Sequence, residues 1–393
     1  MHIYTNTIFN QLLTFLPKYK FKQYIEEHKA DRNIKKMTAW NHLIVLLYAQ
    51  ATGKESLREI ETGLNLHGGI WYHLGIRTVA RSSISDANNR RDYKIFEKLF
   101  YALLKQCKEI TPKRKFNFKN PLYSFDGSVV HLCLSVFDWA KYGKTKGALK
   151  LHCLLNNRTA IPELINVTEG KISEITFAKH INLSSLEKGS IIVFDRGYID
   201  YKWWKRINDK DMYFVTRLKK NQNIFVIGQH NRKKLEEGIL ADERVMFGDY
   251  SAQIYKYGTD DLRRVTYLDK NTNEVYQYIT NNFKLTAKQI ADIYKDRWQI
   301  ELFFKWIKQN LKIKTFLGTS KNAVLSQVWV AMIYYLLLNY IKFQTKFEKS
   351  LLEFTRMIRE TLLFRRSIID LLSLESRSLY RFTEFKNSQL AFW

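Results

Sequence analysis

The spacing of apolar residues divides the chain into three regions. Up to about residue 115, apolar residues recur at three- and four-residue intervals, which predicts helices. After Pro121 the pattern changes to short alternating or wholly apolar runs of β-forming residues, which predicts strands. Helical spacing returns after about residue 284. The chain is therefore expected to fold as an α/β protein with helical regions at both ends.

The N-terminal region is expected to be entirely helical. Thr38 is expected to cap a helix that ends near Gly53, and Ser83 or Ser85 to cap a longer helix that continues through Leu103. A short helix over 55–64, a glycine-containing loop and a helix with a basic start suit a helix-turn-helix reader of DNA. The arginines at that start are Arg77, Arg81, Arg90 and Arg91. An ordinary helical bundle with a basic surface explains the same pattern equally well. Residues 111–121 are expected to form a basic linker.

The middle region has the order of elements of an RNase H-like fold. Strands are expected at 122–125 with a continuation at 129–136, and at 148–155, 161–167, 191–194 and 213–217, with helices at 177–186 and 201–207. A polar segment at 218–284 follows. Its candidate strands are 224–227, 252–257, 264–268 and 275–280. We interpret this segment as a β-rich insertion before the last helix of the core.

The last helix of this core is expected over 291–308. At about 100° per residue, four polar residues share a stripe roughly 60° wide: Tyr294, Arg297, Glu301 and Lys308. The neighbouring stripe, which should face a core, consists of Ile293, Ile300, Phe304, Ile307 and Leu311. One carboxylate thus lies between cations and a phenol, an arrangement that suits rigid placement beside a polyanion. A solvated edge of an ordinary amphipathic helix is the alternative.

An apolar segment at 323–341 is long enough to span a membrane, but Ser326, Gln327 and Asn339 interrupt it. We therefore interpret it as a buried core helix. A basic helical tail with Arg356, Arg359, Arg365 and Arg366 follows.

The charge of the chain indicates a polyanionic partner. Lys and Arg total 64 against 38 Asp and Glu, a net charge of +26. This excess is spread along the chain, which favours nucleic acid over a membrane surface. The three cysteines lack metal-ligand spacing and fit a reducing cytosol. No signal peptide is expected, because Lys18 and Lys20 precede any adequate apolar run.

Three carboxylates have positions that suit joint chemistry. Asp126 lies on or just after the first strand, Asp195 ends the apolar fourth strand, and Glu301 lies on the late helix. In an RNase H-like sheet the first and fourth strands are neighbours, so their aspartates converge. Three oxygen donors suit Mg²⁺ or Mn²⁺, and two such ions about 4 Å apart activate the attacking oxygen and stabilise the leaving one. Taken singly, an aspartate at a strand end is more often a turn or cap residue.

The motifs around these carboxylates resemble those of the IS4-type DDE transposases. The matching residues are Ser-Phe-Asp-Gly-Ser at 124–128, Val-Phe-Asp-Arg-Gly-Tyr at 193–198 and Tyr-x2-Arg-x3-Glu-x6-Lys at 294–308. The resemblance covers about 120–340. Residues 147–152 and 161–162 also resemble the family's second and third strands, and the N-terminal helices more weakly resemble the leader domain of one subgroup.

The resemblance implies a transposase of an insertion sequence that moves by cut and paste. Metal-activated water cuts one strand at each end, and the freed 3′ hydroxyl then attacks the other strand or the target. It implies that Asp126, Asp195 and Glu301 are catalytic metal ligands. It also implies that Tyr294, Arg297 and Lys308 hold phosphates. Further DNA-contact candidates are Trp298, which would stack on an extruded base or else belong to the core, and Arg196 and Lys150. His152 is a further candidate for the active site, and Lys150 and His152 could equally be ordinary sheet-face residues.

The expected domains are a helical DNA-binding domain at 1–115, a catalytic domain at 120–343 with an insertion at about 218–284, and a basic helical region at 344–393. The expected partners are double-stranded DNA, as terminal inverted repeats and target, and a second copy of the chain on DNA. We expect a cytoplasmic, nucleoid-associated bacterial protein with no membrane partner. A nuclease that never joins strands and a non-catalytic DNA-binding descendant of a transposase are the alternatives.

Overall fold

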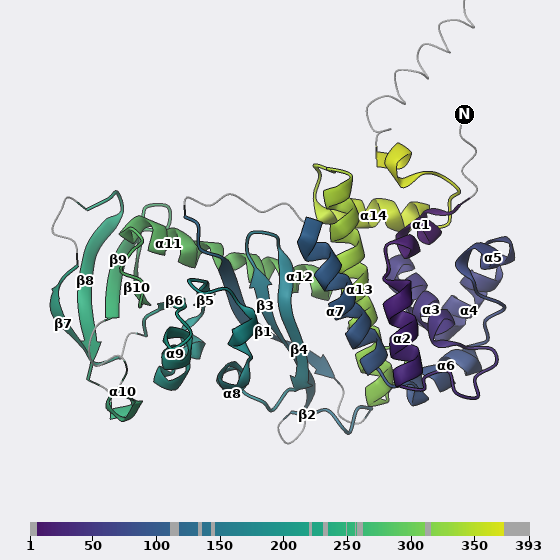
Figure 1. Cartoon of the computed structure of the whole chain (residues 1–393), viewed down its shortest axis with the longest axis horizontal. Helices are drawn as coiled ribbons and strands as arrows, with labels where there is room; N and C mark the ends of the chain where they lie inside the picture. The colour runs from purple at the N-terminus through teal and green to yellow at the C-terminus, as the bar shows by residue number, and fades with distance from the viewer. Residues whose placement is uncertain are drawn as a thin grey trace, which may run out of the picture. The chain divides into compact units, whose positions relative to one another are not determined.

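The computed structural model describes residues 6–110, 118–132, 136–142, 146–219, 222–230, 235–248, 250–255, 257, 262–310 and 316–372. The chain forms two compact units (Figure 1). One consists of residues 112–305 and contains the sheet. The other consists of residues 1–111 and 306–393, and its described elements are helices.

The strands that the structure describes form a single ten-stranded sheet. They are β1 (Leu122–Leu132), β2 (Lys141–Tyr142), β3 (Lys146–Asn156), β4 (Ile161–Glu169), β5 (Ile191–Phe194), β6 (Tyr213–Arg217), β7 (Ile224–Gln229), β8 (Ile239–Phe247), β9 (Leu262–Asp269) and β10 (Glu274–Thr280). The order across the sheet is β2-β3-β1-β5-β6-β10-β9-β8-β7. Off this path, β4 pairs with residues 149–156 of β3, beyond the two residues that pair with β2. Strand β1 is antiparallel to β3 and parallel to β5, and β5 is parallel to β6.

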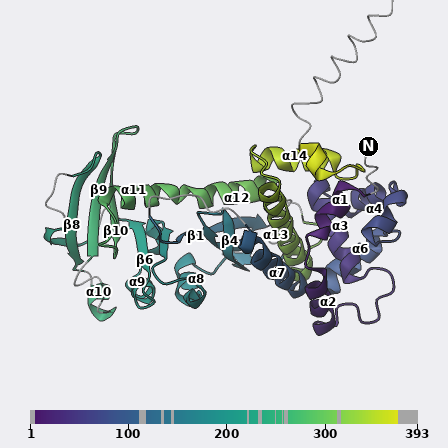
Figure 2. The same cartoon turned by 45° about the horizontal axis from the view of Figure 1, so that its top comes forward.

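Helices cover both faces of the sheet, because side chains of the central strands alternate between two cores. Phe125, Phe194 and Phe214 pack on one face with α8 (Glu174–His180) and α9 (Tyr201–Asn208). Leu122 and Val193 pack on the other face with α11 (Ala287–Asp296). Figures 1 and 2 show α8 and α9 on the face opposite α11.

The central strands match the expectation closely, whereas the first strand and the first helix differ. The two expected pieces of the first strand are one continuous strand, which keeps its register with β3 through Asp126 and Gly127. Helix α8 begins at Glu174, three residues before the expected start, because the Ser173 side chain caps it. A separate 3-10 turn, η2 (Leu183–Ser185), follows it.

In the inserted region one expected strand is wrong and one strand was missed. The expected strand at 252–257 is instead α10 (Tyr250–Tyr255), a short helix that buries Ala252 in the core beside α9. Strand β8 was not expected, because its centre reads Asp-Glu-Arg. In the sheet Asp242 and Glu243 are paired with Arg263 and Arg264 of β9, and these pairings compensate the burial of charge.

The helical unit begins with α1 (Ile8–Thr14), α2 (Lys18–Glu27), α3 (Ala39–Thr52), α4 (Leu57–Asn65), η1 (Gly68–Ile70), α5 (Trp71–Leu74), α6 (Arg81–Arg90) and α7 (Lys94–Ile110). Thr38 caps α3, and Gly53 ends it at a φ of 72°, as expected. The expected helix starting at Ser83 or Ser85 is instead two helices. It begins at Arg81 and breaks at Arg91, whose backbone is extended. Residues 66–80 connect α4 to α6, a far longer connection than a helix-turn-helix turn.

After α12 (Trp298–Asn310), α13 (Lys321–Gln344) and α14 (Leu351–Thr361) complete the helical unit. Helix α13 is long and apolar enough to cross a membrane, yet 94% of its most apolar window is buried inside the protein. Its contacts with α3, α6, α7 and α14 are typical of a core helix. The tail arginines Arg356 and Arg359 lie on α14, and Arg365 and Arg366 follow it.

Candidate active site

Asp126 and Asp195 lie on the same face at the same level of two neighbouring strands. The parallel register pairs Leu122 with Ile191 and Ser124 with Val193, a constant offset of 69 residues. Asp126 and Asp195, which directly follows β5, have this same offset, 195 − 126 = 69, two residues beyond the last pair. Because Leu122 and Val193 face α11, the alternation of the strands places both aspartates on the α11 face.

The Asp126 carboxylate is held in a partly desolvated position. Its Oδ1 accepts a hydrogen bond of 2.8 Å from the Gly127 N–H, and its side chain is 21% exposed. Burial raises the pKa of Asp126 to about 7, and the negative charges of Asp195 and Glu174 add to the rise against the opposing effects of the Gly127 bond and Arg297. A cation beside this carboxylate would therefore relieve an unfavourable concentration of negative charge.

The Asp195 carboxylate is fixed by the turn that follows β5. Its Oδ1 accepts a 2.7 Å hydrogen bond from the Gly197 N–H and caps η3 (Arg196–Tyr198). A Cβ at residue 197 would lie 2.9 Å from that oxygen, so glycine leaves room for the carboxylate. The Thr216 hydroxyl donates to the Asp195 carbonyl at 3.1 Å and ties the turn to β6.

The helix expected over 291–308 is interrupted at Arg297. Helix α11 begins at a capping box formed by Thr286 and Gln289 and ends at Asp296, and α12 starts at Trp298. The Asn157 amide donates to the Asp296 carbonyl at 3.0 Å and to its carboxylate at 2.8 Å. Because Asn157 is fully buried after β3, it anchors the end of α11 against the sheet. No periodicity along the helix could have predicted this distant partner.

Arg297 links two of the three carboxylates. Its guanidinium donates to Glu301 and lies 3.9 Å from Asp126, measured from Nη1 to Oδ2. Burial alone would lower the pKa of Arg297, but Glu301, Tyr294 and Asp126 raise it overall. The expected convergence is therefore present between Asp126 and Asp195, and Arg297 connects Glu301 to Asp126.

The oxygen donors of this site have the chemistry that hard divalent cations require. Asp126 and Asp195 face the same side of the sheet, and burial, with the charges of Asp195 and Glu174, raises the pKa of Asp126. Within the described residues no three Asp, Glu, His or Cys side chains are spaced to hold a metal ion. Glu301 is instead paired with Arg297. These carboxylate oxygens fit a divalent metal ion. To bind it, Glu301 would have to give up its ion pair with Arg297.

An aromatic cavity of about 300 Å³ adjoins Arg297. The Arg217 guanidinium lies 4.5 Å from the centroid of the Tyr276 ring, and the rings of Tyr278 and Tyr294 are 4.7 Å apart. Trp298 also lines the cavity and is 56% exposed, so it is not a core tryptophan. Sequence reasoning missed Arg217, which ends an otherwise ordinary buried strand.

Lys150 and His152 lie on the opposite face of the sheet from Asp126. The Lys150 ammonium donates to the Ile172 carbonyl at 3.1 Å and lies 3.5 Å from Glu174. The His152 ring stacks on Phe177, and burial lowers its pKa to about 4. Both side chains already have structural partners, as the alternative of ordinary sheet-face residues expects, and a DNA contact by Lys150 stays a prediction.

Glu174 is a neighbour of the site that sequence reasoning missed. A Cβ at Gly127 would lie 3.0 Å from its Cγ, and its charge contributes to the raised pKa of Asp126. Its only sequence signal is its place after the Ser173 cap. Arg196 is exposed on η3, directly after Asp195. Lys308 follows Glu301 by seven residues on α12, and the compact units divide this helix before Lys308.

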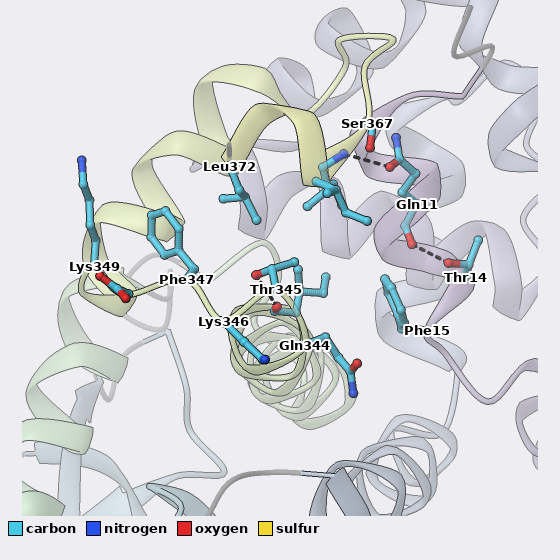
Figure 3. Close-up of a pocket in the computed structure, with 14 residues that line it drawn as sticks. Gln11, Thr14, Phe15, Gln344, Thr345, Lys346, Phe347, Lys349, Ser367 and Leu372 are labelled. Carbon is cyan, nitrogen blue, oxygen red and sulfur yellow. Dashed lines mark hydrogen bonds between the residues drawn. The ribbon is translucent and has the colours of Figure 1, made fainter. Parts of the chain in front are cut away.

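A cavity of about 850 Å³ lies in the helical unit, where α1, the end of α13 and residues 367–372 meet (Figure 3). Its lining includes Phe15, Thr345, Phe347 and Leu372 and contains none of the three carboxylates. This cavity is larger than the one beside Arg297, so cavity volume does not identify the candidate active site.

Comparison with known proteins decides the family. A model of the transposase DDE domain matches residues 117–337, more than half of the chain. A probable transposase of insertion sequence IS5377 from Geobacillus stearothermophilus is 28% identical over 67% of this chain and 68% of its own length. The chain belongs to the IS4-type DDE transposases. It is accordingly an insertion-sequence transposase and a metal-dependent enzyme, since DDE transposases generally use divalent metal ions.

Other relatives of this transposase agree. A putative transposase, y4zB, of Sinorhizobium fredii is 32% identical over 72% of this chain and 78% of its own length. A putative transposase for IS4SA from a Synechocystis strain is 26% identical over 72% and 75%. A domain of unknown function (DUF4372) matches residues 4–77. The structure of a piggyBac transposase synaptic complex with hairpin DNA has a TM-score of 0.46 at 11% identity, over 98% of this chain and 83% of that one. That likeness is too weak to support a structural argument.

Proposed function

We propose that this transposase binds the terminal inverted repeats of its element and moves it by metal-dependent strand cleavage followed by strand transfer. The observation that carries the proposal is the common 69-residue offset of Asp126 and Asp195 on neighbouring strands, together with Arg297 between Asp126 and Glu301. The two aspartates and the glutamate act together on one phosphodiester.

The catalytic core is RNase H-like. The strand order β4-β3-β1-β5-β6, with β1 antiparallel to β3 and parallel to β5, supports this assignment. Residues 120–343 supply the catalytic function, with the β-rich insertion at about 218–284. Residues 1–115 bind DNA, and residues 344–393 form a basic helical region.

Asp126, Asp195 and Glu301 hold Mg²⁺ or Mn²⁺, as two ions. When bound, such ions polarise the attacking oxygen and stabilise the leaving one. The chain's own residues position the phosphodiester. The Asp195 turn fixes one carboxylate, the Gly127 N–H orients another, and Arg297 carries positive charge between Asp126 and Glu301.

The DNA backbone beside the cut is held by Arg297, Tyr294 and Lys308, with Arg196 as a further phosphate contact. Trp298 stacks on a base displaced from the duplex, and the adjoining aromatic cavity with Arg217 accommodates it. The exposure of Trp298 and the cation above Tyr276 support this assignment.

The working form is a homodimer on two DNA ends, in the bacterial cytoplasm at the nucleoid, with no membrane partner. The reason for a dimer is chemical: cut and paste requires both ends to be cut and joined, and each chain has one set of three carboxylates. The burial of α13 supports the absence of a membrane span.

Strand joining tests this function against simple hydrolysis. Purified protein, Mg²⁺ and a labelled duplex of the element's end should yield 3′-nicked ends and then longer products joined to a target plasmid. A protein that nicks the end but never joins it would be the nuclease of the alternative reading. A protein that binds the end and does neither would be the non-catalytic descendant.

A further inference from the structure

A basic cavity of about 540 Å³ lies in the helical unit, between the α2–α3 loop and α6. The cations that line it without an ion pair among the described residues are Lys29, Arg32, Lys35, Lys36 and Arg90. All five are exposed. The loop lies within the match to the domain of unknown function, and α6 lies beyond it.

The α2–α3 loop, which carries four of these cations, is held by hydrogen bonds from the buried Arg91. Arg91, only 5% exposed, donates from Nη2 to the Met37 carbonyl at 2.7 Å and to Asp31 at 3.2 Å. The same Asp31 oxygen accepts the Ala39 N–H at 2.6 Å. A single guanidinium thus ties both ends of the loop together, and the Asn41 amide holds the Lys36 carbonyl at 2.8 Å. The cations are presented by a preorganised loop, which lowers the entropic cost of binding.

The negative charges near the cavity do not neutralise this set. Asp31 is paired with Arg91, and Asp92 lies 3.1 Å from the His28 ring, which carries a charge only when protonated. Asp86 on α6 also lines the cavity and is the acidic residue there with no ion pair among the residues that the structure describes. Even with Asp92 counted beside Asp86, five cations face two carboxylates, and the net positive cavity calls for an anion that is itself multivalent or extended.

The surface beside the cavity favours a DNA duplex over a small anion. Ser83 and Arg90 of α6 line the cavity, and the adjacent stripe of the same helix consists of Ser82, Ser85 and Asn89. Ser82 and Asn89 are exposed. Short polar side chains on a helix next to a line of cations are the pattern with which proteins reach base edges after fixing the backbone.

We propose that this cavity binds consecutive phosphates of the DNA backbone and thereby places the Ser82–Asn89 face of α6 against a groove of the duplex. The inference rests on the proposed function, since the duplex is the DNA on which the transposase acts. It assigns a role to the loop in the domain of unknown function. The contact is sequence-independent, because it is made to phosphates and not to bases.

The test compares two double variants of the full-length protein that remove the same charge. Lys35→Gln with Lys36→Gln alters the cavity. Lys20→Gln with Lys105→Gln alters exposed lysines elsewhere in the same unit. Binding to a labelled duplex of mixed sequence is measured by fluorescence anisotropy over a range of salt concentrations. Each lost phosphate contact lowers the slope of log affinity against log salt by about 0.9, so the cavity variant should lose about two units of slope.

The outcomes separate the two proposals. If the cavity variant has the same affinity and slope as the control variant, the phosphate site is wrong and the transposase function is untouched. If the wild type binds neither the mixed duplex nor the element's end, both proposals fail. A loss seen on the element's end but absent on the mixed duplex would overturn the backbone contact, because a phosphate contact weakens every sequence equally. Thermal unfolding of both variants confirms that the exposed substitutions leave the fold intact.

Discussion

Asp126 and Asp195 face the same side of the sheet from neighbouring parallel strands, at the offset of 69 residues that the β1–β5 register fixes. A single residue inserted into either strand would turn one carboxylate to the opposite face, because side chains alternate along a strand. The pairing of β1 with β5 therefore determines which face of the sheet carries the two carboxylates. The hydrogen bonds from Gly127 and Gly197 then orient each carboxylate.

The first prediction concerns the carboxylates themselves. Asp126→Asn, Asp195→Asn and Glu301→Gln should each abolish cleavage of the element's end while leaving its binding largely intact. Each change removes one anionic oxygen ligand and almost no volume. Cleavage is measured on a labelled end duplex in Mg²⁺, and binding by anisotropy with the same duplex. Near wild-type cleavage by any one variant would remove that residue from the metal site.

The second prediction concerns the buried anchor of the α11–α12 break. Asn157→Ala leaves the Asp296 carbonyl and carboxylate without their amide donor, which should destabilise the protein by about 1–3 kcal/mol. Cleavage should fall more than DNA binding, because Arg297 directly follows the anchored residue and Glu301 lies in the first turn of the next helix. Denaturant unfolding and cleavage assays give the two readouts.

The control for that anchor is Asn271→Ala, an exposed asparagine in the turn between β9 and β10. It should change neither stability nor cleavage. If the two alanine variants behave alike, Asn157 does not set the geometry at Arg297.

The outcome at this break shows what the sequence can and cannot predict. Periodicity predicted the central strands β5 and β6 to the residue, and capping chemistry predicted both ends of α3. These features depend on neighbours within a few residues. At the break, Asp296 accepts from Asn157, which lies 139 residues earlier, and no local pattern contains that contact.

The same limit applies to charge. The Asp-Glu-Arg run at the centre of β8 does not have the pattern of a strand. The strand forms because arginines of β9 pair with its two carboxylates, and the sequence of β8 does not contain that contact. The Arg91 backbone breaks the expected α6–α7 helix where its side chain holds the α2–α3 loop. For the site, motif and order predicted the three carboxylates. Arg217 had no sequence signal and Glu174 only its place after a helix cap, so both became apparent only through tertiary contacts.

The third prediction concerns the buried ion pair of the insertion. Arg263 and Asp242 are each 1% exposed and form two hydrogen bonds of 2.7 and 2.8 Å. Arg263→Met should destabilise the protein by about 3–5 kcal/mol, because it leaves an uncompensated buried carboxylate. The double change Arg263→Met with Asp242→Leu should recover part of that loss. The recovery is partial because Arg263 also donates to the Asn282 and Leu285 carbonyls.

Chemical denaturation measures both variants, with Lys270→Met as the control. Lys270 pairs with Glu237 on the surface of the same insertion, where an ion pair adds little stability. A double variant no more stable than Arg263→Met alone would show that the lost carbonyl contacts, and not the stranded Asp242 charge, account for the effect.

The last prediction is that two chains act together on two DNA ends. Glu301→Gln chains that bind DNA but do not cut are mixed in increasing proportion with wild-type chains, and cleavage is measured on a plasmid carrying both ends. Each chain supplies one set of carboxylates, so a paired complex cuts both ends only when both chains are active. Double-end cleavage should then fall roughly as the square of the active fraction, and single-end products should accumulate. Independent monomers would behave differently: with DNA in excess, double-end activity per wild-type chain would stay constant as inactive chain is added. A curve of that second form would exclude the paired complex, whatever the oligomeric state of the protein off DNA.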